Sequence, residues 1–468
     1  MRRRNSLLTR RQVLATAAVA PLALSQGASK PNIVYIMADD LGYADVSCYG
    51  RRDYKTPNID SLAADGMKFL QAYANSAVCS ATRTALITGR YQYRLPVGLE
   101  EPIGSGAKGE RNKGVPDDHP TMPSLLRKAG YGTTLIGKWH LGNLPEHSPL
   151  KNGYDHYWGL HNGGIDYFTH KYGPADSNTD DLWEDEVPVH ENGYMTTLIG
   201  NHAVKVISDY AAAKKPFFLS LHFNAPHWPW EGPEDEAESR RVRSLAQFDA
   251  GTIKTYAKMV VEMDTQIGRV LQTLKSTGID GNTIVVFTSD NGGERFSDTW
   301  PFTGKKSELL EGGLRIPAIV RWPGHVKPGT ESQQVAMSMD WMPTFLEAAG
   351  TSPDPGYPMD GISLIPALGG GAAVSRKVYW RFHQSSQRAV RDGDMKFVKI
   401  GENTFLFNVV EDPLERANLK ARQPEVYQRL VQDYENWNSK MLPEDPRAPT
   451  YGFSDRDLAD HGVGRRTQ

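Results

Sequence analysis

Short apolar runs that end in polar residues recur along much of the chain. Four of them cover residues 32–38, 131–136, 217–223 and 283–289. Continuous apolar runs of this length are typical of strands that are buried on both faces of a sheet. The pattern therefore predicts four buried strands whose C-terminal ends carry polar side chains.

Helical patterns lie between these predicted strands. Thr56 and Pro57 have the residue types of an N-cap and a first helical residue, and further helices are expected over 122–129 and 252–274. Alternating strands and helices predict an α/β fold with a largely parallel sheet between helices. Ligands of such sheets bind beyond the C-terminal ends of the strands.

The pattern changes in a passage rich in Pro and Gly at residues 352–371, and we place a domain boundary near residue 372. Beyond it, three short strands at 377–382, 395–400 and 404–409 precede a helical pattern at 424–441. We therefore predict a large domain over 29–371. A smaller C-terminal α+β domain with an antiparallel sheet and a polar tail follows over 372–468.

Residues 1–28 have the pattern of an export signal. They contain five Arg, no acidic residue, an apolar run at 13–24 and small residues at 25–28. The run of about 12 residues is shorter than the roughly 20 that span a bilayer, and we expect no membrane span after signal removal. Residues 9–14, Thr-Arg-Arg-Gln-Val-Leu, resemble the twin-arginine export motif, whose machinery carries folded proteins. We expect export by this route to the bacterial periplasm.

Composition excludes several classes of protein. The chain has 468 residues, of which 39% are hydrophobic and 23% charged, as in a large folded protein and unlike a disordered one. Removing the five leader arginines changes the net charge from −2 to −7. A mildly acidic protein is not a general nucleic-acid binder, so any anion must be met by a local cluster of basic side chains.

Acidic and amide side chains follow two of the predicted strands. Asp39 and Asp40 come after the first, and Asp290 and Asn291 come after the strand at 283–289. If these strands are neighbours, three carboxylates and an amide form a site for Ca²⁺ or Mg²⁺. Acidic pairs also cap loops and helix N-termini, and the residue types alone leave both interpretations open.

The chain has two cysteines, Cys48 and Cys79. An exported protein would ordinarily pair them, but one bridge across about 30 residues adds little to so large a core, and we expect no disulfide. A helix that begins near Ser80 and ends at Gly89 would put Cys79 at its positive N-terminal end, with Arg83 one turn later. This position suits an anion or a reactive side chain, whereas a buried structural cysteine is the alternative.

The segment Cys79-Ser80-Ala81-Thr82-Arg83, followed by Thr88-Gly89-Arg90, resembles the Cys-x-Pro/Ala-x-Arg motif of the cysteine-type sulfatases. The cysteine of that family becomes formylglycine. The resemblance continues in family order through residues 56–60, 137–142, 289–292 and 311–315 and extends to 405–413. It implies an alkaline-phosphatase-like α/β core and a small C-terminal domain.

The resemblance also implies roles for single residues. The ligands of one Ca²⁺ would be Asp39, Asp40, Cys79 as formylglycine, Asp290 and Asn291. The catalytic and sulfate-contacting residues would be Cys79, Arg83, Lys138, His140, His227 and Lys306. Lys305 is an alternative to Lys306 because the two lysines are adjacent. A cytoplasmic formylglycine-generating enzyme would be the maturation partner.

The need for a modified cysteine has a chemical reason. A thiolate is a soft ligand that fits poorly on a hard cation, whereas a hydrated aldehyde carries two hydroxyl groups. One hydroxyl can attack sulfur, and the other can lose its proton and eject sulfate by C–O cleavage. The resemblance gives His140 the second step and gives His227 protonation of the leaving oxygen. The sequence alone leaves a structural role open for each histidine.

We therefore expect a calcium-dependent hydrolase of aryl or carbohydrate sulfate monoesters. The alternatives are a phosphate or phosphonate ester hydrolase on the same scaffold and a non-catalytic anion-binding protein whose Cys79 stays a thiol. Asp264 lies in the predicted long helix, where a solvated or ion-paired acid is expected. Trp228 can line a pocket or pack in the core, and neither role is favoured. The Gly-rich stretch at 161–167 has no assigned role.

Overall fold

A ten-stranded sheet forms the centre of the large domain within the described residues, which in this computed structural model are 30–104, 106–172, 179–241 and 251–451. The predicted export leader at 1–28 lies outside them. In sheet order the strands are β13 (Thr330–Ser332), β2 (Met67–Phe69), β12 (Ala318–Arg321), β11 (Thr283–Ser289), β1 (Asn32–Ala38), β10 (Phe217–His222), β4 (Gly132–Lys138), β5 (His156–Leu160), β8 (Trp183–Glu184) and β9 (Val187–Pro188).

The five central strands are parallel, and they include all four strands that the sequence predicts. Neighbouring strands pair in parallel from β11 through β1, β10 and β4 to β5, whereas β12, β2 and β8 add antiparallel pairs toward the two edges. The predicted α/β class with a mainly parallel sheet is therefore confirmed. Because the central strands share one direction, their C-terminal ends meet at one edge of the sheet.

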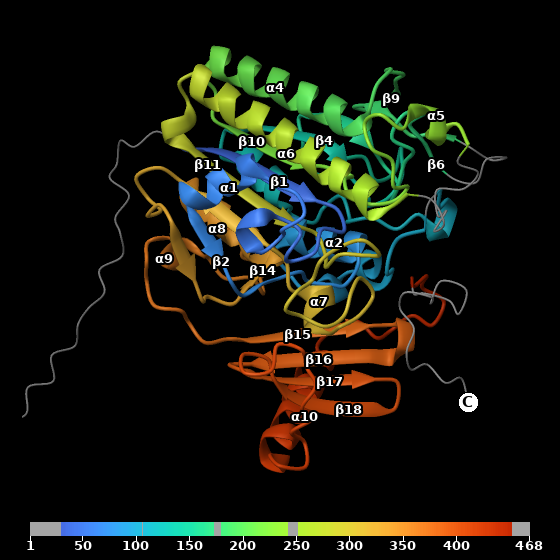
Figure 1. Ribbon diagram of the computed structural model, residues 1–468, viewed down its shortest axis with the longest axis vertical. Helices are drawn as coiled ribbons and strands as arrows, with labels where there is room; N and C mark the ends of the chain where they lie inside the picture. The colour runs from blue at the N-terminus through green and yellow to red at the C-terminus, as the bar shows by residue number, and fades with distance from the viewer. Residues whose placement is uncertain (1–29, 105, 173–178, 242–250, 452–468) are drawn as a thin grey trace, which may run out of the picture.

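Helices cover both faces of this sheet (Figure 1). Among the described residues they are α1 (Pro57–Ala64), α2 (Cys79–Thr88), α3 (Met122–Lys128), α4 (Met195–Ala213), α5 (Glu236–Ser239), α6 (Ile253–Ser276), α7 (Glu311–Leu314), α8 (Trp341–Ala348), α9 (Ile365–Leu368) and α10 (Pro424–Asn438). The side chains of β1 alternate, so that Val34 and Ile36 pack on one side with α4 and α6 whereas Ile33 and Tyr35 pack on the other with α2, α3 and α8. No helix among the described residues is long and apolar enough to cross a membrane.

Two short ladders join segments outside the main sheet. They pair β3 (Ala72–Tyr73) with β14 (Ala336–Met337), and β6 (Lys171–Tyr172) with β7 (Thr179–Asp180). β3 precedes α2 in the chain, and Tyr73 of β3 and Met337 of β14 belong to the same apolar cluster as Ala81 of α2. The β3–β14 ladder therefore helps to fix the segment that leads to Cys79.

The small domain has the predicted α+β class, an antiparallel sheet with one helix, but the sheet has four strands because β16 adds to the three that the sequence predicts. Its strands follow one another as β15 (Lys377–Phe382), β16 (Gln387–Asp392), β17 (Met395–Ile400) and β18 (Asn403–Asn408), with α10 packed against them. The predicted boundary near residue 372 falls in the loop between α9 and β15. Apolar side chains of this domain, including Trp380, pack with Val78 and Ala81 beside Cys79.

Asp264 does not have the solvated role that its position in the sequence suggested. It is 2% exposed, and its carboxylate accepts the backbone N–H groups of Asn58 and Ile59, with the shortest contact at 2.8 Å. These groups belong to the first turn of α1, whose N–H groups have no partner within the helix. Asp264 of α6 therefore caps α1 from across the domain.

Candidate active site

The two acidic pairs lie side by side at the C-terminal edge of the sheet. Ala38 pairs with Ser289 in the parallel ladder of β1 and β11, so the residues that follow these strands leave the sheet together. The Asp40 N–H donates to Asp290 Oδ1 at 3.2 Å, and Asn291 Nδ2 donates to Asp40 Oδ1 at 2.7 Å. All four residues of the two pairs are buried. The structure thus brings together the carboxylates and the amide that the sequence placed after two strands.

The donor atoms of this cluster suit a hard cation. Asp39 Oδ1 and Asn291 Oδ1 are buried oxygens that accept no hydrogen bond from the described residues. Asp39, Cys79 and Asp290 each offer one ligand atom, and these atoms lie within 4.8 Å of one another. Burial and the neighbouring Asp290 raise the pKa of Asp39 well above its usual value, and a cation between the two carboxylates would relieve that repulsion.

Cys79 is the first residue of α2 and is 2% exposed. The helix ends at Gly89, whose φ of 65° is a left-handed conformation that glycine adopts without a steric penalty. The sulfur atom therefore lies at the positive end of a helix, facing the acidic cluster. Burial raises the pKa of the Cys79 thiol, so the unmodified side chain is a thiol at neutral pH. Cys48 and Cys79 are both unpaired, as expected.

Arg83 connects this helix to the acidic cluster. Its Nη2 and Nε atoms donate to Asp290 Oδ2 at 2.8 and 3.1 Å, and its Nη1 donates to the carbonyl oxygen of Lys138 at 2.9 Å. The guanidinium is 2% exposed, so these contacts replace the water that it loses on burial. Arg83 thereby fixes the N-terminal end of α2 against the ends of β4 and β11.

Two buried lysines balance the charge of the first acidic pair. Lys138, the last residue of β4, places Nζ 2.5 Å from Asp39 Oδ2, and Lys306 places Nζ 2.6 Å from Asp40 Oδ2. Burial alone would raise the pKa of Asp40, but Lys306 and His227 outweigh it and lower the pKa to about 2. Lys305 is only partly buried, so Lys306 is the lysine that the structure brings into the cluster.

His140 faces Cys79. Its Nδ1 atom lies 3.2 Å from the sulfur, and its Nε2 atom lies 3.0 Å from the carbonyl oxygen of Ile103. The backbone φ of His140 is 54°, and Asp40 and Ser307 have values of 62° and 70°. Left-handed backbone is uncommon outside glycine, and it occurs here at two residues of the cluster and at Ser307, which follows Lys306.

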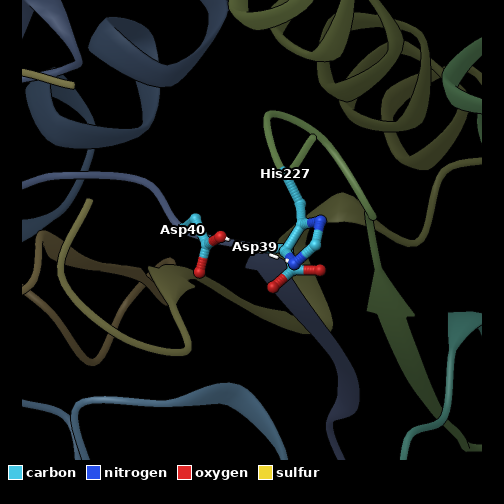
Figure 2. A group of neighbouring side chains, drawn as sticks. All are labelled: Asp39, Asp40 and His227. Atoms are coloured by element: carbon cyan, nitrogen blue, oxygen red, sulfur yellow. Dashed lines mark ion pairs between the residues drawn. The ribbon is translucent and has the colours of Figure 1, made fainter. Parts of the chain in front are cut away.

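His227 reaches the cluster from the loop after β10. Figure 2 shows its ring extending toward Asp39 and Asp40, with Nε2 3.6 Å from Asp40 Oδ2. Its Nδ1 lies 2.7 Å from the carbonyl oxygen of Trp228, which can only accept, so Nδ1 carries a proton. Burial, with a contribution from Lys306, lowers the pKa of His227 well below its usual value.

Three further features of the cluster were missed from the sequence. His222 ends β10 with Nδ1 3.3 Å from Arg83 Nη1, and Glu294 lies with Oε2 3.8 Å from Lys306 Nζ. The glycines at 163 and 164 pack so closely that an added Cβ would lie 2.6 Å from His140 Cε1 and 3.2 Å from His227 Cε1, respectively. His222 could have been found, because it is a polar residue at the end of a predicted strand. Nothing in the sequence of the glycine-rich stretch at 161–167 indicated that it packs against His140 and His227.

Comparison with known proteins agrees with this geometry. Residues 31–351 match the sulfatase family, and residues 302–440 match the C-terminal region of N-sulphoglucosamine sulphohydrolase. The chain belongs to the sulfatase family. The fold and the family match identify it as a sulfuric ester hydrolase of the alkaline phosphatase superfamily, as the sequence motifs predicted.

Similar proteins cover most of this sulfatase. N-acetylgalactosamine-6-sulfatase of Rattus norvegicus is 34% identical over an alignment of 392 residues that covers 80% of this chain and 72% of the relative. Arylsulfatase A of Bos taurus is 30% identical over 89% of this chain and 85% of its own. The crystal structure of Ps i-CgsB in complex with k-i-k-neocarrahexaose has a TM-score of 0.81 and 32% identity, covering 92% of this chain and 97% of that one.

Proposed function

We propose that this sulfatase hydrolyses carbohydrate sulfate esters with residue 79 in its formylglycine form and with one Ca²⁺ at the acidic cluster. The observation that carries the proposal is the surroundings of Cys79. Its sulfur atom lies at a helix N-terminus, 3.2 Å from His140 and within 4.8 Å of ligand atoms of Asp39 and Asp290. A cysteine with only a packing role would not need carboxylates, basic side chains and a histidine around its sulfur atom.

Asp39, Asp40, Asp290 and Asn291 would hold the calcium ion. Their oxygens are the donors that Ca²⁺ prefers, and two of them are buried without hydrogen bonds from the described residues. When bound, the ion would supply positive charge next to residue 79 and to the sulfuryl oxygens. Lys138 and Lys306 keep the surrounding carboxylates paired and leave the site attractive to an anion.

Formylglycine hydrate would supply two hydroxyl groups on one carbon, one to attack sulfur and one to release sulfate by C–O cleavage. His140 supports the release, because its Nδ1 faces the side chain of residue 79 and can take up the proton of the second hydroxyl. Burial and Lys138 lower the pKa of His140 well below its usual value, so the ring is neutral and able to accept a proton at pH 7.

The leaving oxygen needs a proton, and His227 is placed to supply it. A bound sulfate ester adds negative charge near Lys306 and Asp40, which favours protonation of His227 at Nε2. The Nδ1–H group of His227 stays hydrogen-bonded to the carbonyl oxygen of Trp228, so His227 would give the proton on Nε2 to the leaving oxygen. Lys138 and Lys306 would stabilise the oxygens of the sulfuryl group as they become more negative, and a bound calcium ion would add positive charge there.

A carbohydrate leaving group is supported by the relatives. One relative is named for N-acetylgalactosamine 6-sulfate, and the Ps i-CgsB structure holds k-i-k-neocarrahexaose. Phosphonate monoester hydrolase of Agrobacterium radiobacter has a TM-score of 0.61 and 21% identity, a likeness of fold that does not favour its reaction here.

Export and maturation complete the proposal. The leader at 1–28 has the twin-arginine pattern, and the twin-arginine machinery carries proteins that have already folded. A cytoplasmic formylglycine-generating enzyme can therefore act on Cys79 before the protein reaches the periplasm. A single oxidised position is expected, because Cys48 lacks the motif around it.

The test is a peptide mass measurement coupled to activity. The chain is produced with and without a formylglycine-generating enzyme, and the peptides that contain Cys79 and Cys48 are weighed. We expect the aldehyde mass at residue 79 alone, in a fraction that matches the rate on N-acetylgalactosamine 6-sulfate. Full activity with an intact thiol would contradict the formylglycine proposal, and faster turnover of p-nitrophenyl phosphate than of p-nitrophenyl sulfate would favour the phosphatase alternative.

A further inference from the structure

The last described residues of the chain return to the large domain. The Glu101 N–H donates to the carbonyl oxygen of Pro449 at 2.9 Å, and the Tyr451 N–H donates to the carbonyl oxygen of Glu101 at 2.6 Å. Thr450 between them forms a parallel β-bridge with Glu101. This three-residue segment, 449–451, therefore has a fixed register on the large domain.

The segment places the Tyr451 ring next to the active-site lysine. Lys306 Nζ lies 5.4 Å from the centroid of the Tyr451 ring and 6.0 Å from that of Trp228. Both distances are within the range in which a cation interacts with an aromatic face. Lys306 is 2% exposed, whereas Trp228 and Tyr451 each keep part of their surface exposed. Two partly exposed aromatic residues thus approach one buried active-site lysine.

Trp228 marks the side of the site from which the alcohol departs. Its ring centroid lies 4.3 Å from that of His227, the residue to which we assign protonation of the leaving oxygen. The group bonded to that oxygen must extend from His227 toward solvent, because the opposite side is filled by the acidic cluster. Tyr451 and Trp228 approach the same lysine, so both border the space into which this group extends.

We propose that Tyr451 and Trp228 form two walls of the subsite for the leaving group, and that this subsite takes a flat ring with an apolar face. The C–H face of a sugar ring and the face of an aryl ring share this chemistry, and aromatic side chains pack against both. Tyr451 is then a specificity-determining residue supplied by the C-terminal segment. The inference rests on the proposed function, because the roles of His227 and Lys306 define where the leaving group lies.

Glu101, whose backbone pairs with Tyr451, contacts the small domain and lies close in the chain to a residue that contacts His140. Glu101 is 2% exposed, and its carboxylate accepts the N–H of His383 in the small domain at 2.6 Å. Two residues later, the carbonyl oxygen of Ile103 accepts a hydrogen bond from His140 Nε2, and the Ile103 N–H donates to Ser80 Oγ at 2.9 Å. Residues 101–103 therefore contact Tyr451, the small domain and His140.

Binding measurements test the inference separately from turnover. Tyr451→Ala and Tyr451→Phe are compared in the calcium-loaded full chain that carries Cys79→Ala, so that no probe is consumed. The probes are N-acetylgalactosamine 6-sulfate, p-nitrophenyl sulfate and inorganic sulfate, and calorimetry gives each Kd. Tyr357→Ala is the matched control, because Tyr357 is a partly exposed loop tyrosine whose ring contacts His119.

We expect Tyr451→Ala to weaken the binding of at least one ring-bearing ester about three- to tenfold, with inorganic sulfate unchanged within twofold. Tyr451→Phe keeps the ring and should bind all three probes as the parent chain does, as should Tyr357→Ala. The ester that loses more affinity identifies a sugar or an aryl ring as the better fit. Tyr451→Leu repeats the test with an apolar side chain that has no ring, in case the alanine variant is unstable.

Two results would overturn the inference. Equal loss of affinity for inorganic sulfate and for both esters would show that Tyr451 supports Lys306 and not the leaving group. Unchanged affinity for all probes in folded Tyr451→Ala and Tyr451→Leu chains would show that the ring does not contact ligand. Failure of the proposed function appears differently, as absent turnover by the chain with unmutated, oxidised residue 79.

Discussion

His140 presents Nδ1 to the sulfur of Cys79 at 3.2 Å while its Nε2 lies 3.0 Å from a backbone carbonyl. A carbonyl oxygen can only accept, so this second contact puts the single proton of the neutral ring on Nε2. The lone pair of Nδ1 is then directed at residue 79. This is the tautomer that a base for a hydroxyl group on residue 79 requires, and the backbone fixes it before substrate binds.

Replacing His140 with alanine should therefore slow turnover without weakening binding. We expect His140→Ala to lower kcat by about 10²- to 10⁴-fold, the usual contribution of a general base, with KM changed by less than threefold. His325→Ala is the control, since His325 is exposed and stacks on Trp322. Steady-state rates on one sulfate ester measure the effect. A variant that kept kcat within a few-fold of the parent would exclude His140 as the base.

The acidic cluster should lose calcium when Asp290 loses its charge. We expect Asp290→Asn to weaken calcium binding by about tenfold or more, because the substitution removes a charged ligand and the partner of Arg83. Activity should fall with metal content and recover in part when calcium is raised. Metal analysis after dialysis and activity as a function of calcium concentration are the measurements.

Asp280→Asn is the matched control for that experiment. Asp280 lies just before the other end of β11, where both of its oxygens contact Arg321 at 2.7 Å. Both substitutions thus break an Asp–Arg pair next to the same strand, and only one touches the cluster. Equal calcium content in the two variants would contradict the ligand assignment.

The sequence predicts much of this site because of how parallel sheets are built. Asp39 and Asp290 are 251 positions apart, yet each follows a buried apolar run, and parallel neighbours bring such positions to one edge. The same rule applied to His222 would have found its contact with Arg83. The strand at 387–392 was missed because its arginines interrupt the apolar alternation, and one of them, Arg391, is buried against Tyr73.

Other contacts could not be predicted from local patterns. Asp264 caps a helix whose contacted residue Ile59 lies 205 positions away in the chain, and Tyr451 approaches Lys306 from a segment without regular periodicity. An acidic residue on a helix and a tyrosine in an irregular segment are both common, so neither residue type stands out in the sequence. Only the tertiary arrangement gives these side chains their partners, so the local sequence carries no signal of them.

A buried ion network should make the small domain depend on one lysine. Lys396 of β17 is fully buried, with Nζ 2.9 Å from Glu311 Oε1 and 3.0 Å from Glu415 Oε1. Lys396→Ala leaves the buried carboxylates short of a partner, and we expect a loss of about 3–5 kcal/mol in the free energy of unfolding. Lys396→Met keeps most of the volume and should lose a similar amount, because charge is the cause.

Chemical denaturation measures this effect, with Lys399→Ala as the control. Lys399 lies on the same strand and is only partly buried, so its removal should change stability by less than about 0.5 kcal/mol. A methionine variant as stable as the parent would show that the Glu311 and Glu415 carboxylates do not need Lys396.

Stability should also fall as pH rises, because Glu101 is a buried acid. Burial raises its pKa from 4.5 to about 8, although the N–H of His383 and the charge of Arg381 act in the opposite direction. Between pH 4.5 and about 8 the folded chain holds a proton that the unfolded chain has released. Each pH unit in this range therefore lowers the free energy of unfolding by up to about 1.4 kcal/mol. The contribution of Glu101 to the free energy of unfolding is thus fully present below pH 4.5 and is lost as the pH approaches 8.

Glu101→Gln isolates this contribution, because the amide keeps an acceptor for the N–H of His383 and cannot ionise. We expect the variant to gain stability relative to the parent steadily from pH 5 to pH 8, with thermal unfolding followed at each pH. Activity of the variant at pH 6 should match that of the parent, since the backbone of Glu101 still holds Tyr451. A stability difference that is constant with pH would mean that the carboxyl is already ionised in the folded chain, with Arg381 as its counter-charge.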